Sequence, residues 1–307
     1  GAGRCGGCPW QFVSYAAQCE AKQHRVAVEL GRLGIADPQL LPLIPGDLEL
    51  GYRNRAQLRS DGRRLGFLAA GGGDLVDVEQ CPVLSPGTAA LLAGLRASLP
   101  VRDWRPAGRN QWTTIDIDEI QGTQVGRRLP FRQGNDAQNQ RMRDWLCDRL
   151  RLIGLPAQTK VLELFAGSGN FTEVLSASGC RNVVAVEAVA EATAALAARD
   201  LPGVSVLTHD LYAPGAYARL LRGHGDAQLL LLDPPRDGLQ GAAELFNIRS
   251  KLREILYVSC DLATFCRDVR VMLAAGFEAV AVQPLDLFPQ TPHVELLAHF
   301  RRPAFLC

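Results

Sequence analysis

Cys260 stands where an apolar run, ILYVSC at residues 255–260, stops. In an open α/β sheet, ligands collect in the crevice outside the carboxyl ends of the strands, so a cysteine at such an end faces the reaction centre. This position makes Cys260 a candidate nucleophile for covalent catalysis. The alternative is a small buried cysteine that closes a strand, which is the commoner fate of free cysteines.

A second chemical signal is the stretch VLELFAGSGNF, in which an apolar run leads into Gly167 and Gly169. Glycines at this turn let a cofactor approach backbone that any Cβ atom would block. The next apolar run, NVVAVE, ends in Glu187, at about the spacing where an acidic residue binds ribose hydroxyls in nucleotide-binding βαβ units. The pair predicts a ribose-bearing cofactor, against the alternative of a tight strand-to-helix turn followed by a surface glutamate.

Two cofactors compete for this turn. A dinucleotide places its pyrophosphate on the helix N-terminus and usually requires a third glycine, but Thr172 holds that position. S-adenosylmethionine carries no phosphate, and Glu163 would attract its sulfonium and amino groups while repelling a pyrophosphate. The sequence therefore favours S-adenosylmethionine. Asp210, which closes the run VSVLTHD, is expected beside the adenine, where its carboxylate can accept a hydrogen bond from the exocyclic amine.

The run AQLLLLDPPRDGL brings Asp233 to the carboxyl end of a further strand. The two prolines that follow fix φ and remove two backbone donors, so this loop is stiff and its polar contacts fall to side chains. Amine methyltransferases bind the target nitrogen with a similar acidic or amide residue, but they normally have an aromatic residue after the prolines. Arg236 stands there instead, and an arginine suits a phosphate-bearing substrate.

The elements that must position these residues begin at Val161, where short apolar runs alternate with amphipathic stretches of helical length. The runs are VLELF, NVVAVE, VSVLTHD, AQLLLLDPP, EILYVSC, FEAVAVQPLDLF and VELLAHF. This alternation specifies βαβ units and a parallel sheet that is covered on both faces. We predict a doubly wound, Rossmann-like α/β domain. Only residues 289–293 separate the last two runs, which is too short for a crossover helix, so the final strand should be antiparallel.

The N-terminal part predicts a smaller, mostly β module. Residues 13–33 have helical spacing, and Gly34 would cap the helix end. Residues 52–60, 64–69 and 74–78 have the pattern of short strands joined by turns. The segment 91–127 is ambiguous, with WTTIDIDEI as one strand. We therefore divide the chain into an N-terminal region, 1–127, and a second domain, 128–307.

Composition restricts the class of protein further. The chain has 307 residues, 47% of them hydrophobic and 21% charged, and a net charge of +1. These values are typical of a soluble globular protein, and they argue against one that coats nucleic acid by bulk charge. We find neither a membrane segment nor a signal peptide. Nine cysteines without a secretory segment indicate a reducing compartment, so we expect a cytoplasmic protein.

Six stretches together resemble the RNA uridine-C5 methyltransferase family, which makes 5-methyluridine in rRNA and tRNA. In order they are FRQGN, LELFAGSGNF, VVAVE, LLDPPRDGL, YVSCDLATFCRD and FPQTPHVELLAHF. The resemblance covers residues 131–302, and a further region of resemblance lies near the N-terminus. Its last two motifs are the most discriminating. The resemblance implies a class I methyltransferase sheet and S-adenosylmethionine as the cofactor.

The resemblance also implies roles for individual residues. In this family a cysteine thiolate adds to uracil C6, the resulting enolate takes the methyl group at C5, and a carboxylate removes the C5 proton. Cys260 matches that nucleophile and Glu295 matches that base. Asp233 matches a residue kept beside the base and the cofactor, where it could accept from uracil N3. Gln133 matches a position that contacts the cofactor or uracil. Family cofactor contacts also fall on Phe165, Asn170 and Glu187, while Asp210 aligns less securely.

Cysteines near the N-terminus predict a metal centre. Cys5 and Cys8 have the two-residue gap that lets neighbouring thiolates share a metal, and Cys81 follows the β module. These positions resemble the [4Fe-4S] ligands of the bacterial 23S rRNA members of the family. A further ligand of those relatives lies just upstream, which here would precede Gly1; Cys19 is an alternative. A zinc site or plain reduced thiols would fit the same residues.

The densest basic stretch lies between residues 51 and 64 and includes Arg53, Arg55 and Arg59. Alternate spacing places Arg53 and Arg55 on one face of a strand, where they could bind phosphates. Together with Arg236 they form our predicted RNA contacts, against the alternative of a solvated strand edge. Because sequence-specific RNA recognition usually targets unpaired bases, we expect a loop uridine, in rRNA rather than tRNA.

Three functions therefore compete. The first is an RNA uridine-C5 methyltransferase that needs no obligatory protein partner. The second is an amine methyltransferase that uses Asp233 directly, which leaves Cys260 and Glu295 without a role. The third is a noncatalytic RNA-binding or iron-sulfur protein, which would tolerate the loss of both residues.

Overall fold

The computed structural model describes residues 5–106, 111–246 and 251–303. The chain forms two compact units, and each is assembled from separate segments. The first comprises Gly1–Ala21, Pro45–Asn139 and Leu287–Pro292, and the second comprises Lys22–Ile44, Gln140–Asp286 and His293–Cys307. The units interleave along the sequence, so they do not coincide with the single division that we expected between residues 127 and 128.

The first unit contains an antiparallel sheet in the order β3-β2-β1-β4-β5. Its strands are β1 (Arg55–Ser60), β2 (Leu65–Leu68), β3 (Leu75–Asp77), β4 (Thr113–Asp118) and β5 (Gly122–Val125). The three short strands expected after residue 52 are confirmed. The ambiguous segment resolves into the end of helix α2 (Pro86–Ala97), a 3-10 turn η1 (Arg102–Trp104) and strands β4 and β5. Alternate residues of β1 are buried, as one covered face of a sheet requires.

The second unit contains the sheet that the apolar runs predicted. Its order is β11-β12-β10-β9-β6-β7-β8. The strands are β6 (Val161–Leu164), β7 (Val183–Glu187), β8 (Val204–Thr208), β9 (Leu229–Leu232), β10 (Glu254–Ser259), β11 (Glu278–Leu285) and β12 (Glu295–Arg301). Strands β10, β9, β6, β7 and β8 pair in parallel, whereas β12 pairs antiparallel with β10 and β11. The doubly wound fold with an antiparallel last strand is confirmed.

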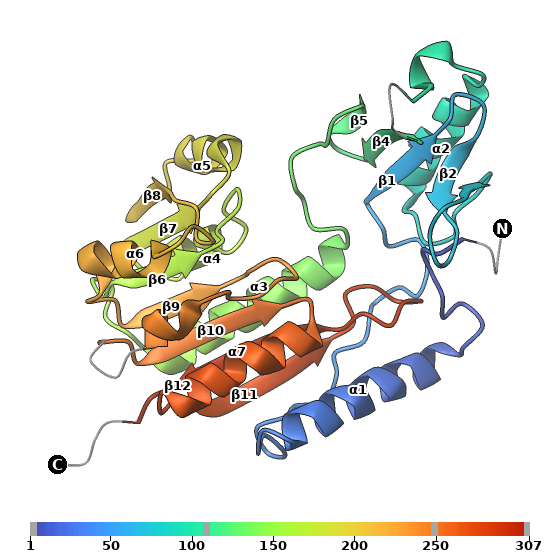
Figure 1. Cartoon of the computed structure of the whole chain (residues 1–307). Coiled ribbons are helices and arrows are strands. Elements are labelled where there is room, and N and C mark those ends of the chain that lie inside the picture. The colour runs from blue at the N-terminus through green and yellow to red at the C-terminus, as the bar shows by residue number, and fades with distance from the viewer. Residues whose placement is uncertain (1–4, 107–110, 247–250, 304–307) are drawn as a thin grey trace. The chain divides into compact units, whose positions relative to one another are not determined.

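Helices cover both faces of this sheet. They are α3 (Asp136–Ile153), α4 (Thr172–Ala177), α5 (Ala190–Ala197), α6 (Ala216–His224), the 3-10 turn η2 (Ala242–Phe246) and α7 (Leu262–Ala274). Helix α7 lies along strands β10 to β12 (Figure 1), and its Phe265 ring contacts Tyr257 and Phe300 at centroid distances of 5.3 and 6.4 Å. Neighbouring residues of β7 face opposite ways, and Ala185 packs against Leu196 of α5.

Helix α1 (Tyr15–Gly31) contributes to both units. From Lys22 onward its apolar side chains Val26 and Leu30 belong to the core of the second unit. Lys22 Nζ lies 2.5 Å from Asp286 Oδ1, and both side chains are fully buried. Because a buried charge is costly without its partner, this pair holds the segment after Lys22 to the larger sheet. No helix in the described residues is long and apolar enough to cross a bilayer.

Candidate active site

Cys260 and Glu295 are brought together by the antiparallel pairing of β10 with β12. Ser259 is paired with Leu296 at the end of this ladder. Cys260 directly follows Ser259 and Glu295 directly precedes Leu296, so both stand at the same end of the ladder, where the charge of Glu295 acts on the thiol. The candidate nucleophile and the candidate base are therefore neighbours.

Asp233 completes this group from the adjacent parallel strand. Leu232 at the end of β9 pairs with Tyr257 of β10, and the backbone N–H of Asp233 donates to the carbonyl of Leu164 at 3.3 Å. The charge of Asp233 acts on both Cys260 and Glu295. The structure thus gathers a thiol and two carboxyl groups at the carboxyl end of the sheet.

The ionisation of these groups is strongly perturbed. Burial, followed by the charges of Glu295 and Asp233, raises the pKa of Cys260 to about 11, although Arg236 opposes this shift. Burial and then Asp233 raise the pKa of Glu295 well above its usual range. Burial raises the pKa of Asp233 to about 7, with Glu187 adding to the effect. In the free protein Cys260 is a protonated thiol at neutral pH, so a positive charge must arrive to activate it.

The loop between β6 and α4 has an unusual backbone. Phe165, Gly167 and Gly169 have positive φ angles of 63°, 54° and 93°. For a residue with a Cβ atom, such as Phe165, the left-handed region costs about 1–2 kcal/mol, and strain of this kind clusters at functional sites. The Phe165 ring lies 5.6 Å, centroid to centroid, from that of Tyr212.

Glu187 fixes this loop at the end of β7. Its Oε2 accepts from the backbone N–H of Gly167 at 3.0 Å. Its Oε1 accepts from the N–H groups of Ala188 and Val189 at 2.8 and 2.9 Å. Because an ionised carboxylate has about four acceptor positions, Glu187 keeps capacity for a ribose hydroxyl.

Glu163, at the third position of β6, is a buried carboxyl group with an unmet hydrogen-bonding requirement. Its side chain is 2% exposed, and Oε2 has no hydrogen-bond partner among the described residues. Burial raises the pKa of Glu163 to about 8, and Asp233 adds to the shift, while Thr172 and Arg199 partly offset it. A buried acceptor of this kind fits the cationic sulfonium and ammonium groups of S-adenosylmethionine.

Three further cofactor candidates lie in different settings. Both the backbone oxygen and the side-chain oxygen of Asn170 accept from Arg143. Asp210 follows β8, where Oδ1 accepts from the N–H of Tyr212 at 2.9 Å. Gln133 belongs to the first unit, and its Oε1 accepts from the N–H of Gly134. The cofactor roles of Asn170, Asp210 and Gln133 stay predictions.

The two loop glycines should respond differently to alanine. A Cβ atom at Gly169 would lie 2.3 Å from Leu196 Cδ1, whereas one at Gly167 would meet no atom within 4 Å. Both substitutions carry the cost of positive φ, about 1–2 kcal/mol, but only Gly169→Ala also needs the buried Leu196 side chain to move. We expect Gly169→Ala to lower the melting temperature more than Gly167→Ala, as measured by calorimetry. Equal melting temperatures would contradict this packing.

Glu163 should make stability depend on pH. Its pKa is 4.5 in a model compound and about 8 in the fold, so the folded state holds its proton where the unfolded chain has lost it. Between these values stability falls as pH rises, by at most about 1.4 kcal/mol per pH unit from this group. Glu163→Gln should therefore gain stability over the wild type from pH 5 to pH 8 in urea titrations. If the free energies of unfolding of the two proteins changed in parallel with pH, Glu163 would be ionised in the folded protein.

Cys5, Cys8 and Cys81 lie in the first unit and influence one another. Burial, followed by the effects of Cys81 and Cys5, raises the pKa of Cys8 to about 11, although Arg53 opposes this shift. Burial also raises the pKa of Cys81, and Cys5 adds to that shift. Within residues 5–106, 111–246 and 251–303, however, no three His, Cys, Asp or Glu side chains are arranged to hold a metal ion. The metal centre stays a prediction.

The arginines of the basic stretch, Arg53, Arg55 and Arg59, are only partly exposed and donate within the first unit. Arg55 Nη1 donates to two carbonyls of the segment 130–132, both at 3.1 Å. The other two donate to neighbouring carbonyl and side-chain oxygens. Arg236, by contrast, is exposed. Contact of these four residues with RNA stays a prediction. Arg53, Arg55 and Arg59 also donate hydrogen bonds that stabilise the first unit.

Phe131 is a functional candidate that the sequence reasoning missed. Its side chain is 76% exposed, and the Arg55 guanidinium lies 5.6 Å from the ring centroid. Hydrogen bonds from Arg55 to the carbonyls of Pro130 and Arg132 fix the backbone on either side of it. Exposed aromatic rings of this kind stack on nucleic acid bases. The feature of the sequence that could have indicated Phe131 is its position between a proline and an arginine in a polar stretch.

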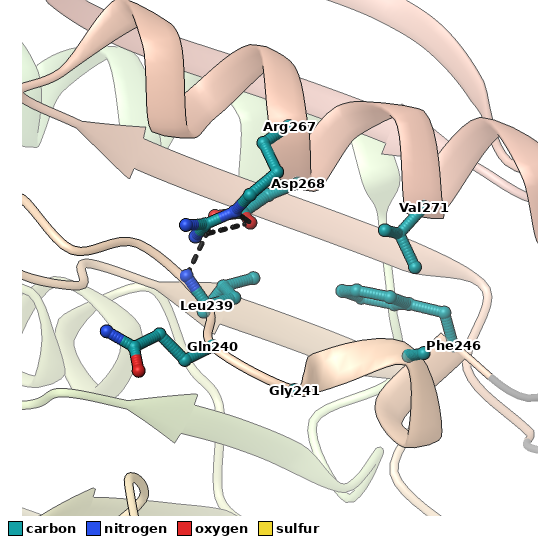
Figure 2. A pocket seen from close by; sticks show the side chains of 8 residues that line it. Leu239, Gln240, Gly241, Phe246, Arg267, Asp268 and Val271 are labelled. Carbon is teal, nitrogen blue, oxygen red and sulfur yellow. Dashed lines mark hydrogen bonds and ion pairs between the residues drawn. The ribbon is translucent and has the colours of Figure 1, made fainter.

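Helix α7 fixes the loop that follows Asp233. Asp268 Oδ2 accepts from the N–H of Leu239 at 2.8 Å and from the Tyr257 hydroxyl at 2.7 Å. Figure 2 shows this bond to Leu239 beside a hollow of about 250 Å³. The hollow is lined by Leu239, Gln240, Gly241, Ala243, Phe246, Arg267, Asp268 and Val271. None of the predicted site residues lines it, so it is separate from the candidate active site.

Comparison with known proteins decides the family. No family model matches the chain. An uncharacterized RNA methyltransferase of Nitrosomonas europaea is 41% identical over 303 residues, which cover 97% of this chain and 77% of that protein. A 23S rRNA (uracil(1939)-C(5))-methyltransferase of Halomonas elongata is 32% identical over 370 residues, which cover 98% and 75%. The chain belongs to the RNA uracil-C5 methyltransferase family.

A solved structure supports the fold of this RNA uracil-C5 methyltransferase family member. The tRNA (uracil-54, C5)-methyltransferase of Pyrococcus abyssi, in complex with S-adenosyl-L-homocysteine, matches with a TM-score of 0.70 at 21% identity. The match covers 96% of this chain and 85% of that chain. The class I methyltransferase fold expected from the sequence is therefore confirmed.

Proposed function

We propose that this chain transfers a methyl group from S-adenosylmethionine to C5 of a uridine in RNA. The observation that carries the proposal is that Cys260 and Glu295 stand at the same end of the β10–β12 ladder, where the charge of Asp233 acts on both. An amine methyltransferase would need only Asp233. A thiol and a second carboxyl group at the same strand ends are what C5 chemistry requires.

In the proposed reaction the Cys260 thiolate forms a bond to uracil C6, and the C5–C6 electron pair moves onto the ring as an enolate. S-adenosylmethionine supplies the methyl group that C5 takes up. Glu295 then removes the C5 proton, the C5–C6 double bond re-forms, and the Cys260 thiolate leaves. Asp233 accepts a hydrogen bond from uracil N3 and orients the ring.

The perturbed pKa values suit a site that is inactive until it is filled. The carboxyl groups of Glu295 and Asp233 act on the thiol and, with burial, raise its pKa to about 11, so the free protein has no nucleophile ready at neutral pH. A bound sulfonium cation would favour the ionised carboxylates and the thiolate alike. The raised pKa of Glu295 also makes its carboxylate a stronger base for the C5 proton once it is ionised.

We further propose 23S rRNA as the substrate, with tRNA as the alternative. Relatives with about 30% identity are named for 23S rRNA, and they match nearly the whole chain. Arg236, which is exposed, acts on both the thiol and the exposed His293, and a phosphate next to the target uridine could bind there. Ribosomal RNA as substrate also favours the cytoplasm as the location.

Cys5, Cys8 and Cys81 are proposed as three ligands of a [4Fe-4S] cluster. Their support is the two-residue gap, the thiolate donor type and the mutual electrostatic influence of the three sulfurs. A cluster there would stabilise the first unit. Protein purified without oxygen should contain about four iron atoms per chain, and a Cys8→Ala variant should contain far less. If the protein purified under those conditions contained no iron, the proposed cluster would be wrong.

Nucleoside mass spectrometry tests the proposed function. The protein is incubated with unmodified 23S rRNA or tRNA transcripts and S-adenosylmethionine that carries a deuterated methyl group, and the RNA is digested to nucleosides. We expect labelled 5-methyluridine from the rRNA. Label on an amino group would support the amine methyltransferase, and no label in either RNA would contradict both.

A further inference from the structure

The cofactor loop needs support from its surroundings. Residues 165–170 include Phe165, Gly167 and Gly169 at positive φ, and one of these is not glycine. A loop in sparsely populated conformations persists only when neighbouring groups hold it there. Glu187 holds one end, at the N–H of Gly167. The carbonyl groups that follow need other partners.

Two arginines from distant parts of the sequence supply them. Arg199 Nη1, just after α5, donates to the carbonyls of Ser168 and Gly169 at 3.0 and 2.9 Å. Arg143 Nη1, on α3, donates to the carbonyl of Asn170. Three successive carbonyl oxygens of the loop are therefore bound by guanidinium groups.

Glu173, in the first turn of α4, joins the two arginines. Its Oε2 lies 2.9 Å from Arg143 Nη2 and 3.0 Å from Arg199 Nη2. The two arginines lower the pKa of Glu173, so it is ionised at neutral pH. The three side chains are 21%, 46% and 33% exposed for Arg143, Glu173 and Arg199, so the ion pairs by themselves add little stability.

We propose that Arg143, Glu173 and Arg199 are positioning residues that preset the loop 165–170 for the S-adenosyl ligand. This inference rests on the proposed function only for the identity of that ligand. These three residues, which we call the clamp, order the loop before binding, so the ligand does not have to order it. Arg199 also acts on Glu163, the buried carboxyl group before the loop, and favours its ionised form.

Calorimetric binding of S-adenosylhomocysteine tests the clamp without RNA or catalysis. Arg143→Gln, Arg199→Gln and Glu173→Gln should each weaken binding about tenfold or more. Arg143→Lys keeps the charge but cannot fork between two oxygens, so it should restore only part of the affinity. The control is Arg151→Gln, also on α3, whose side chain is 73% exposed and pairs only with Asp148 in the described residues. It should bind like the wild type.

Two further measurements separate positioning from simple stability. Hydrogen exchange of the amides at 166–171 in the free protein should accelerate in the clamp variants and not in Arg151→Gln. Because Glu173 acts on the loop through the two arginines, the loss in Arg143→Gln/Glu173→Gln should be smaller than the sum of the single losses. Unchanged affinity with a lower melting temperature would overturn the inference. A wild-type protein that binds no S-adenosylhomocysteine would instead overturn the proposed cofactor.

Discussion

Replacement of Cys260 by alanine should abolish methyl transfer to RNA and leave cofactor binding intact. The thiol directly follows β10, and the charges of both Glu295 and Asp233 act on it. Without it uracil C5 stays a poor nucleophile, so we expect a loss of more than about 10³-fold in the rate of methyl incorporation. Incorporation of tritiated methyl groups into 23S rRNA measures this effect.

Cys266→Ala is the matched control for that experiment. Cys266 lies in α7, six residues after Cys260, and packs in the core at 3% exposure. It should retain nearly full activity per folded protein. The wild-type rate should also rise with pH above 7, because burial and two carboxyl groups raise the pKa of Cys260. A Cys260→Ala variant with more than a tenth of the wild-type rate would contradict the nucleophile.

Glu295→Gln should produce a different defect. If Glu295 removes the C5 proton, the variant should still form the bond between Cys260 and uracil C6. It should fail at the removal of the C5 proton, which precedes release of the thiolate. We expect turnover to fall by about 10²–10⁴-fold, the usual contribution of a general base. Protein bonded to methylated RNA should accumulate at the same time. Denaturing gel electrophoresis of labelled RNA with the variant would reveal this complex.

Glu278→Gln provides the control for the base. Glu278 begins β11 as Glu295 begins β12, but it is exposed. Its replacement should change neither turnover nor the amount of complex. If Glu295→Gln loses activity without an accumulated complex, the carboxyl group acts before methyl transfer, and the assigned proton step is wrong.

The local pattern of the sequence was enough to predict the strands and what stands at their ends. Strands β7, β9 and β10 are short apolar runs that end at or just before Glu187, Asp233 and Cys260, so these three residues could be placed from their own neighbours. The loop glycines were equally visible. Predicting Glu295 beside Cys260 needed the family resemblance, because a strand register depends on pairing partners far away in the sequence.

Other features depend on tertiary contacts that no local pattern reveals. Arg143 and Arg199 look like ordinary surface arginines on helical stretches, yet both donate to the cofactor loop. Arg55 looked like an exposed phosphate contact, but its donors reach carbonyls of its own unit. Lys22 is a charged residue in a helical pattern, and its burial against Asp286 is one of the contacts that join the segment 22–44 to the larger sheet.

The central claim is a transient bond between Cys260 and the uracil ring, and RNA that contains 5-fluorouridine tests it most directly. Fluorine at C5 cannot be removed as a proton, so the reaction should stop with the protein bonded to the ring. With S-adenosylmethionine and 23S rRNA fragments, mass spectrometry after denaturation should find a one-to-one adduct that carries one methyl group, with the modified peptide containing Cys260. No adduct, or an adduct on another residue, would contradict the account.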